Sequence, residues 1–369
     1  MSILTTVPDL AKPGGVAAYY AALQGHIGED VDFCPVGSRG SHETSIQKWT
    51  RLLKDYERFC RMIKSGSYDL IHLNPSLGRK ALIRDGLLLL RAKSLGKKVL
   101  VCVHGWDRAC ETSIRRWFLF LFRWVYFKAD AFIVLASQFQ SVLREFGYKK
   151  PIYVETTMVS DEVFSHAQVT PVRSVSEDAG VNILFLSRIE KPKGIYEAID
   201  ALRRLRVKWP SVTMTVAGDG PDRKNAEEYV RTEGIKGVWF LGWITGEQKH
   251  KAFADADIYL LPTTWGEGMP ISVLEAMAYG LPIVTRPVGG LADIIEQGKM
   301  GFTTDSRDPH VFASLLERLI VDRRLRAQIG QYNRSFARRN FTASAVAKRL
   351  VEIYERTMHN APSHCNIPS

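Results

Sequence analysis

A strand–helix–strand unit between Asp257 and Thr285 constrains the fold of this chain more than any other stretch. The apolar run Asp257–Leu261 is typical of a buried parallel strand, and a proline ends it. A helix is expected to begin near Pro270 or Ile271, because proline suits a first helical turn. A glycine and a second proline end that helix, and Pro282–Thr285 is the next expected strand. Parallel strands joined by a helix place a ligand site at the carboxyl edge of an open α/β sheet.

Short apolar runs alternate with helical patterns along the whole chain, which predicts parallel, doubly wound sheets. The strands expected in the first half are Val31–Val36, Asp69–Leu73, Lys98–Val103, Ala131–Leu135 and Ile152–Val154, with helices at about Ser45–Ser65, Leu77–Leu95, Thr112–Lys128 and Ser137–Phe146. We interpret the Ser-rich, charged stretch Val159–Gly180 as a linker. Beyond it, strands are expected at Val181–Leu186, Val212–Ala217, Val238–Leu241, Asp257–Leu261 and Pro282–Thr285. We therefore predict an α/β protein with two Rossmann-like domains at 1–165 and 166–342, a final helix at 343–359 and a loose tail at 360–369.

Charged side chains stand where the expected strands of the second half meet helices. Glu267 lies in the loop before the helix near Ile271, and Glu275 lies on that helix. Carboxylates there accept hydrogen bonds from sugar or ribose hydroxyls, although an isolated pair of glutamates is more often a loop acid and a solvated helix residue. Arg188 and Lys193 follow a strand and precede a helix, where two cations are placed to bind a diphosphate. A solvated basic loop is the alternative for this pair.

The first half offers weaker signals of the same kind. Gly14 and Gly15 precede a helix expected from Val16 to Gln24, and glycines there let a phosphate or hydroxyl approach the backbone. A plain turn explains them as well. His104 follows the strand Lys98–Val103 at its carboxyl end, where a structural role and a site role are equally expected.

The segment from Glu267 to Gly290 resembles the E-x7-E signature of the family 4 retaining glycosyltransferases, which have the GT-B fold. The residues that match this signature are Glu267, Gly268, Leu274, Glu275, Ala276, Met277, Ala278, Gly280, Pro282, Val284, Gly289 and Gly290. A second family pattern is matched by Ser187, Arg188, Lys193 and Gly194. The resemblance extends from about Gly14 to His359 and is more specific in the second half.

This resemblance implies a transferase that moves a sugar from a nucleotide-sugar, with a UDP-sugar favoured, to a sugar acceptor. Arg188 and Lys193 would stabilise the leaving diphosphate, Glu275 would hold the ribose hydroxyls, and Glu267 would hold the donor sugar. The backbone of Gly268, Met269 and Ile271 would assist Glu267. The loop reads Glu267-Gly268-Met269-Pro270 where the family commonly has E-G-F-G, so the identity of the donor sugar stays open.

The remaining implied contacts come from single positions. Gly15 would line the donor phosphate, and His104 would face the donor sugar. Gly218 would lie beside the nucleotide, and the backbone near Trp243 and Ile244 would meet the base. In the GT-B fold a final helix crosses back to the first domain, and the amphipathic segment Ala343–His359 suits that role.

Several sequence features bear on cofactors and location. No Asp-x-Asp motif stands at the carboxyl end of an expected strand and no H-E-x-x-H motif occurs, so we expect no divalent metal and no other cofactor. The five cysteines include no C-x-x-C pair, which is typical of reduced thiols in a cytosol. No signal peptide and no run of about 18 apolar residues is apparent. We therefore expect a cytoplasmic protein, at the inner face of the cell membrane if its acceptor is a lipid.

The chain carries a net charge of +11, and residues 1–165 hold 23 Lys and Arg against 16 Asp and Glu. The helix Thr112–Lys128 is apolar nearly all round, which favours a core helix. Its aromatic and basic residues also suit an anionic membrane surface, as a polyisoprenyl-linked glycan acceptor of cell-surface polysaccharide biosynthesis would require. A soluble transferase acting on a small sugar or metabolite, and a non-catalytic nucleotide- or carbohydrate-binding module, remain open. No nucleic-acid reader motif appears, so no nucleic-acid partner is expected.

Overall fold

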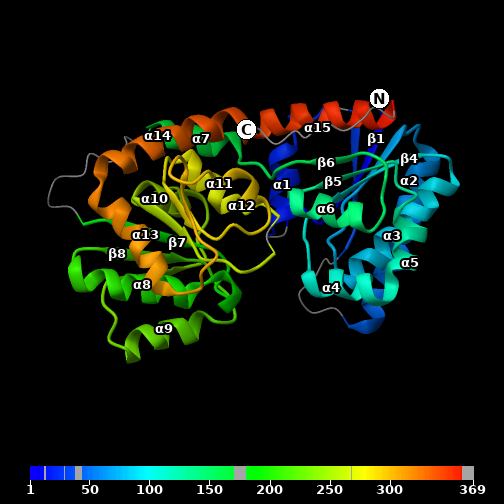
Figure 1. Ribbon diagram of the computed structural model, residues 1–369. Coiled ribbons are helices and arrows are strands. Elements are labelled where there is room, and N and C mark those ends of the chain that lie inside the picture. The colour runs from blue at the N-terminus through cyan, green and yellow to red at the C-terminus, as the bar shows by residue number, and fades with distance from the viewer. Residues whose placement is uncertain (12–13, 29, 38–43, 170–179, 267, 360–369) are drawn as a thin grey trace. The chain divides into compact units, whose positions relative to one another are not determined.

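The computed structural model describes residues 1–11, 14–28, 30–37, 44–169, 180–266 and 268–359. Contacts divide the chain into two compact units. The first comprises Met1–Met158, the short segment Gly266–Met269 and the chain from Ala343 onward. The second comprises Val159–Trp265 and Pro270–Thr342. Each unit is built on its own six-stranded parallel sheet, which confirms the predicted pair of doubly wound sheets (Figure 1).

The sheet of the first unit runs in the order β2-β1-β3-β4-β5-β6, with every neighbouring pair parallel. Its strands are β1 (Ile3–Val7), β2 (Val31–Pro35), β3 (Leu70–Leu73), β4 (Lys98–Val103), β5 (Ala131–Val134) and β6 (Ile152–Val154). Strand β1 lies between β2 and β3, with Ile3 paired to both Val31 and Leu70. The strand order therefore reverses between β1 and β3, and open α/β sheets bind ligands at such a point.

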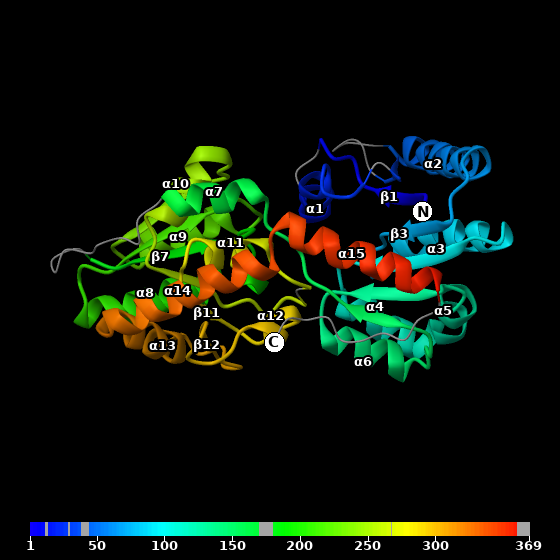
Figure 2. The same cartoon turned by 90° about the horizontal axis from the view of Figure 1, so that it is seen from above.

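Helices cover both faces of this sheet. They are α1 (Gly15–Leu23), α2 (Ser45–Ser65), α3 (Arg79–Ser94), α4 (Arg108–Ser113), a π-helical turn (Ile114–Phe118), α5 (Leu119–Tyr126), α6 (Ser137–Glu145) and α15 (Ala343–Met358). On one face, α2, α3, α5 and α6 bury Phe59, Leu89, Phe122 and Phe139 in a single core. Helices α2, α3 and α5 lie in a row in both views (Figures 1 and 2). On the other face, α1 and α15 form a second core with the sheet.

Helix α15 is fixed to the first sheet by polar contacts as well as by its apolar face. The Arg349 guanidinium donates from Nε and Nη2 to the carboxylate of Glu155, each at 2.8 Å, and Glu155 follows β6. The hydroxyl of Tyr354 lies 2.8 Å from Nδ1 of the buried His72 on β3. A buried bidentate pair needs close geometry to offset its loss of hydration, so these contacts specify one position of α15.

The sheet of the second unit runs in the order β12-β11-β10-β7-β8-β9 and is also parallel throughout. Its strands are β7 (Asn182–Leu186), β8 (Thr213–Ala217), β9 (Val238–Gly242), β10 (Ile258–Leu261), β11 (Ile283–Thr285) and β12 (Gly301–Thr303). Its helices are α7 (Asp161–Val169), a 3-10 turn (Lys191–Lys193), α8 (Ile195–Lys208), α9 (Arg223–Thr232), α10 (Gly246–Ala254), α11 (Ile271–Ala278), α12 (Gly290–Ile294), α13 (Pro309–Val321) and α14 (Arg323–Asn340). The strand order of this sheet reverses between β7 and β10, and open α/β sheets bind ligands at such a point.

Three sequence predictions need correction. Strands β1 and β12 were not expected. The proposed linker begins instead with helix α7, which packs against α10 and α11, while 170–179 lies outside the described residues. The expected helix Thr112–Lys128 is divided into α4, the π-helical turn and α5. Among the described residues, no helix combines the length and apolar character that a membrane span requires.

The prediction that Thr112–Lys128 is a core helix is wrong for its outer side. Phe122 and Tyr126 are buried, but Trp117, Phe120 and Trp124 are 71%, 84% and 54% exposed. The physical reason is that the helix lies in the outer layer, so only one side of it can face the sheet. The π-helical turn adds a residue and changes the direction of the side chains that follow it.

Candidate functional site

The turn after β7 is held against the loop after β10. The chain leaves β7, passes through the 3-10 turn and begins α8 after Gly194, which has φ +82°. A Cβ on Gly194 would stand 2.5 Å from the Pro262 carbonyl oxygen, so only glycine allows this approach. The Pro192 carbonyl accepts hydrogen bonds from the Thr264 N–H at 2.8 Å and hydroxyl at 3.1 Å. The two loops that flank the reversal of strand order are therefore fixed together.

Both predicted diphosphate cations lie in this turn. The side chain of Arg188 is 69% exposed, and its Nε lies 2.5 Å from Oε1 of Glu190. The Lys193 ammonium lies 5.9 Å from the centre of the Trp265 ring. A guanidinium carries five N–H donors, so the contact with Glu190 leaves capacity for phosphate oxygens. The geometry thus brings two cations to the carboxyl end of β7.

Gly218 connects this turn with the ends of β8 and β9. It has φ +136°, and a Cβ there would collide with the Ser187 carbonyl oxygen. Its N–H donates to the Gly242 carbonyl at 2.7 Å, and Gly242 directly precedes Trp243 and Ile244. Trp243 is exposed and Ile244 is partly buried. These backbone bonds order the loops in which the sequence predicts contacts to the nucleotide.

Glu275 is a buried carboxylate of the second unit. It lies on α11, which begins at Ile271 as predicted, and only 6% of the residue is exposed. Its Oε1 accepts from the Lys249 ammonium at 2.7 Å, whereas its Oε2 is buried with no hydrogen-bond partner among the described residues. Burial raises the pKa of Glu275, and Lys249 opposes that shift. A buried acceptor needs a donor in the folded protein, and a water molecule or a ligand hydroxyl can supply one here.

Sequence reasoning missed two cations here. Lys249 on α10 is 26 positions before Glu275 in the chain, so no local spacing signals their pair. Arg286 follows β11 at the same sheet edge and donates from Nη1 to the Ser306 carbonyl at 2.9 Å. Its Nε is buried without a partner in the described part of the chain, and burial lowers its pKa. Its position just after a predicted strand was a usable signal.

His104 lies in the first unit and belongs to a polar group around Asn74. Asn74 follows β3, and its Nδ2 donates to the Thr6 carbonyl at 2.7 Å, which fixes the amide orientation. Its Oδ1 accepts from the Tyr20 hydroxyl at 2.7 Å and lies 2.9 Å from His104 Nε2. Because Oδ1 can only accept, Nε2 carries the proton and Nδ1 keeps a lone pair. Burial beside Tyr19 and Tyr20 lowers the pKa of His104 to about 4, so the ring is neutral at neutral pH.

The other predicted site residues divide between the units. Gly15 begins α1, and a Cβ there would meet no atom of the described residues within 4 Å. Gly268 and Met269 group with the first unit, where the Thr157 hydroxyl donates to the Met269 carbonyl at 3.0 Å. Glu267 lies outside the described residues.

Two family models match the chain. Residues 27–160 match "Glycosyltransferase Family 4", and residues 172–336 match "Glycosyl transferases group 1". Spore coat protein SA of Bacillus subtilis is 29% identical over 182 residues, or 47% of this chain and 48% of that protein. Glycogen synthase of Mycobacterium tuberculosis is 26% identical over 234 residues, or 63% of this chain and 55% of that protein. The chain thus spans about half the length of these curated relatives.

Solved structures have the same architecture. Anabaena HepE in complex with UDP and glucose has a TM-score of 0.72 at 18% identity, over 96% of this chain and 99% of that one. Sucrose-phosphate synthase from Thermosynechococcus elongatus has a TM-score of 0.73 at 18% identity, over 98% of this chain and 100% of that one. The fold is therefore GT-B, as predicted. The two family models match separate parts of the chain, and both describe glycosyltransferases.

Proposed function

We propose that this chain is a retaining glycosyltransferase that moves a sugar from a nucleotide-sugar, with a UDP-sugar favoured, to a sugar acceptor. The observation that carries the proposal is the buried, unpartnered Oε2 of Glu275 at the carboxyl edge of the second sheet. Two ribose hydroxyls are the donors that suit such a carboxylate. Arg188 and Lys193 at the same edge suit the diphosphate, and the UDP bound to HepE supports this class of ligand.

The proposed reaction breaks the bond between the anomeric carbon and the diphosphate oxygen and forms a bond from that carbon to the acceptor oxygen. Attack comes from the face that the diphosphate leaves, so configuration is retained. The proton of the acceptor hydroxyl passes to the leaving phosphate oxygen. Arg188 and Lys193 stabilise the charge that develops on the diphosphate, which is preorganised electrostatic catalysis. Neutral His104 accepts a hydrogen bond from a donor-sugar hydroxyl at Nδ1.

The experiment that tests this function is a donor-hydrolysis screen over UDP-, GDP- and ADP-sugars with purified protein. Release of a nucleoside diphosphate, and an anomeric product of unchanged configuration, are the expected results. If a nucleotide binds but none of the three donor classes is consumed, with or without sugar acceptors, the chain acts as a binding module instead.

An exposed apolar surface on the first unit favours a lipid-linked acceptor. It is formed by Ile83 and Leu87 of α3 and by Trp117, Phe118, Phe120, Leu121 and Trp124 around α5, all more than half exposed. A groove of about 540 Å³ runs between α3 and α5 within this surface. Arg116 lies 5.0 Å from the Trp117 ring, and Lys128 lies 5.6 Å from the Trp124 ring. Apolar side chains beside cations suit an anionic bilayer and the hydrocarbon chain of a polyisoprenyl carrier.

Co-sedimentation with phosphatidylglycerol vesicles separates this acceptor from a soluble one. The protein should bind at low salt and dissociate at high salt, because the attraction to the lipid is screened. Trp117→Ala with Trp124→Ala should weaken binding by at least about tenfold, since each buried aromatic contributes roughly 1.5–3 kcal/mol. Trp239→Ala removes an equally exposed tryptophan of the second unit and serves as the matched control. No binding by the wild type would favour the soluble acceptor.

A further inference from the structure

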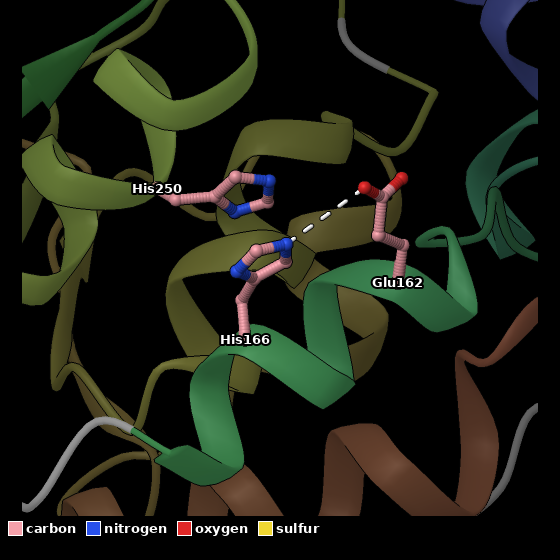
Figure 3. A group of neighbouring side chains, drawn as sticks. All are labelled: Glu162, His166 and His250. Atoms are coloured by element: carbon pink, nitrogen blue, oxygen red, sulfur yellow. Dashed lines mark ion pairs between the residues drawn. The ribbon is translucent and has the colours of Figure 1, made fainter.

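Two histidines and a glutamate meet on the surface of the second unit, outside the residues proposed for transfer. Glu162 and His166 are one turn apart on α7, and His250 projects from α10 (Figure 3). One ligand atom from each residue lies within 4.8 Å of the other two. The imidazole rings stack with centres 4.1 Å apart, and His166 Nε2 lies 3.7 Å from Glu162 Oε1. Figure 3 shows the Glu162 carboxylate beside the edge of the stacked rings.

The orientation of His250 is set by a neighbour. Its Nδ1 lies 2.7 Å from the hydroxyl of Tyr279, at the end of α11. A hydrogen bond at one ring nitrogen fixes the ring and directs the other nitrogen, Nε2, to a ligand. Histidines that bind metals usually have such a partner at their second nitrogen. This contact comes from a third helix and is independent of the spacing on α7.

The donor set has the chemistry of a borderline divalent ion. Two imidazoles and one carboxylate bind Zn²⁺ at about 2.0–2.1 Å, which places tetrahedral ligand atoms roughly 3.3 Å apart. The ligand atoms lie within 4.8 Å of one another, so their separations exceed that value by at most about 1.5 Å. Glu162 is exposed and His166 is partly exposed, so rotation of these two side chains toward the fixed His250 ring can close the difference. Three protein ligands leave a fourth position for water.

We propose that Glu162, His166 and His250 form a binding site for a divalent transition-metal ion of the zinc class. The ion joins α7 to α10. Lys249, which holds Glu275 at 2.7 Å, is the residue before His250, so a bound ion also restrains the helix that carries this lysine. The site is a property of the second unit and does not depend on the proposed transferase activity.

The test is a cobalt titration of the full chain, purified without a histidine tag and freed of metal. One Co²⁺ per chain should produce a visible ligand-field spectrum, and one equivalent of Zn²⁺ should remove it. His166→Ala and His250→Ala should each weaken binding by at least about 100-fold, and Tyr279→Phe by roughly 10- to 100-fold. His310→Ala removes an exposed histidine of α13 and should change nothing.

Thermal unfolding supplies a second readout. Zn²⁺ should raise the melting temperature of the wild type and of His310→Ala, but not of His166→Ala or His250→Ala. The affinity should fall as pH falls, because protons compete for the imidazoles. Circular dichroism of the metal-free variants checks that they fold. The proposal is overturned if the folded His166 and His250 variants bind cobalt as tightly as the wild type, or if the wild type binds no stoichiometric ion.

Discussion

Glu275→Gln tests the nucleotide site most directly, because it changes the charge of one buried group and almost none of its volume. Lys249 has only donors, so it will hold the amide oxygen of the glutamine at the place of Oε1. The amide NH₂ then occupies the place of Oε2, the oxygen that has no partner in the described structure. A ribose hydroxyl that donates to Oε2 would meet a second donor instead.

The size of the effect follows from this exchange. A hydrogen bond to a charged acceptor contributes about 1.5–3 kcal/mol and a neutral one about 1 kcal/mol. The expected loss is therefore about 1–2 kcal/mol, or roughly a 5- to 30-fold weaker affinity. The fold should tolerate the change, since burial already opposes the charged form of Glu275 and the partly exposed Lys249 can reach water.

Isothermal titration calorimetry with UDP measures this affinity. Glu317→Gln is a matched control, because Glu317 also accepts from a lysine, Lys208, at 2.7 Å but stands nearer the surface on α13. Its UDP affinity should equal that of the wild type. A Glu275→Gln protein that folds normally and binds UDP within twofold of the wild type would refute the assignment of Glu275 to the ribose.

The same group predicts a pH dependence. Ribose hydroxyls donate to the carboxylate, so UDP binding favours ionised Glu275 and releases a proton near its raised pKa, which lies above 4.5. The ratio of wild-type to Glu275→Gln affinity should therefore fall as pH falls toward that range. The stability of the free protein depends on pH in the opposite direction. The contribution of Glu275 to the free energy of unfolding is fully present below pH 4.5 and is lost as pH rises through the raised pKa.

Three further predictions concern other groups. Arg188→Ala and Lys193→Ala should each lower turnover about 10²- to 10³-fold with little change in melting temperature. Lys191→Ala, in the same turn, is the control, and near-normal rates in both test variants would exclude the diphosphate role. Turnover should persist in excess EDTA; loss that magnesium or manganese restores would contradict a donor site without metal. Burial lowers the pKa of His72 from 6.5 to about 3, so its contribution to stability is complete above pH 6.5 and is lost as pH falls toward 3. The free energy of unfolding of His72→Gln, measured in urea, should therefore depend less on pH between about 6.5 and 4 than that of the wild type. An equal pH dependence of the two proteins would argue against a buried, neutral His72.

The strands with strong apolar runs were predictable from the sequence. The strand predicted at Lys98–Val103 and the helix predicted at Ser45–Ser65 have the same bounds in the structure. The short β12 was missed because its sequence, Gly-Phe-Thr, holds one large apolar residue, whereas all three residues of the equally short β6 suit a strand. Helix α7 was missed because the predicted linker was judged as one stretch. The serine, proline and charged residues after the helix dominate the composition of that stretch. The π-helical turn leaves no local pattern that distinguishes it from a regular helix.

The candidate site was predictable where it depends on position within a strand–helix unit. Arg188, Lys193 and Glu275 lie at such positions, and the sequence pattern includes them directly. Their partners depend on the tertiary arrangement: Lys249 reaches Glu275 from another helix. The protonation of His104 depends likewise on Asn74, 30 positions earlier in the chain, and on burial beside two tyrosines.

The return of α15 to the first sheet has a consequence for synthesis of the protein. A ribosome makes β1–β6 first, then the whole second unit, and only then α15. Until that helix emerges, the nascent first unit leaves exposed the apolar face that Leu350, Ile353 and Tyr354 later cover. The second unit is therefore expected to fold in a chain that lacks α15, whereas the first is not. Purified chains that end at Thr342 should keep the first unit sensitive to protease while the second resists, and equal resistance of both would exclude this dependence on α15.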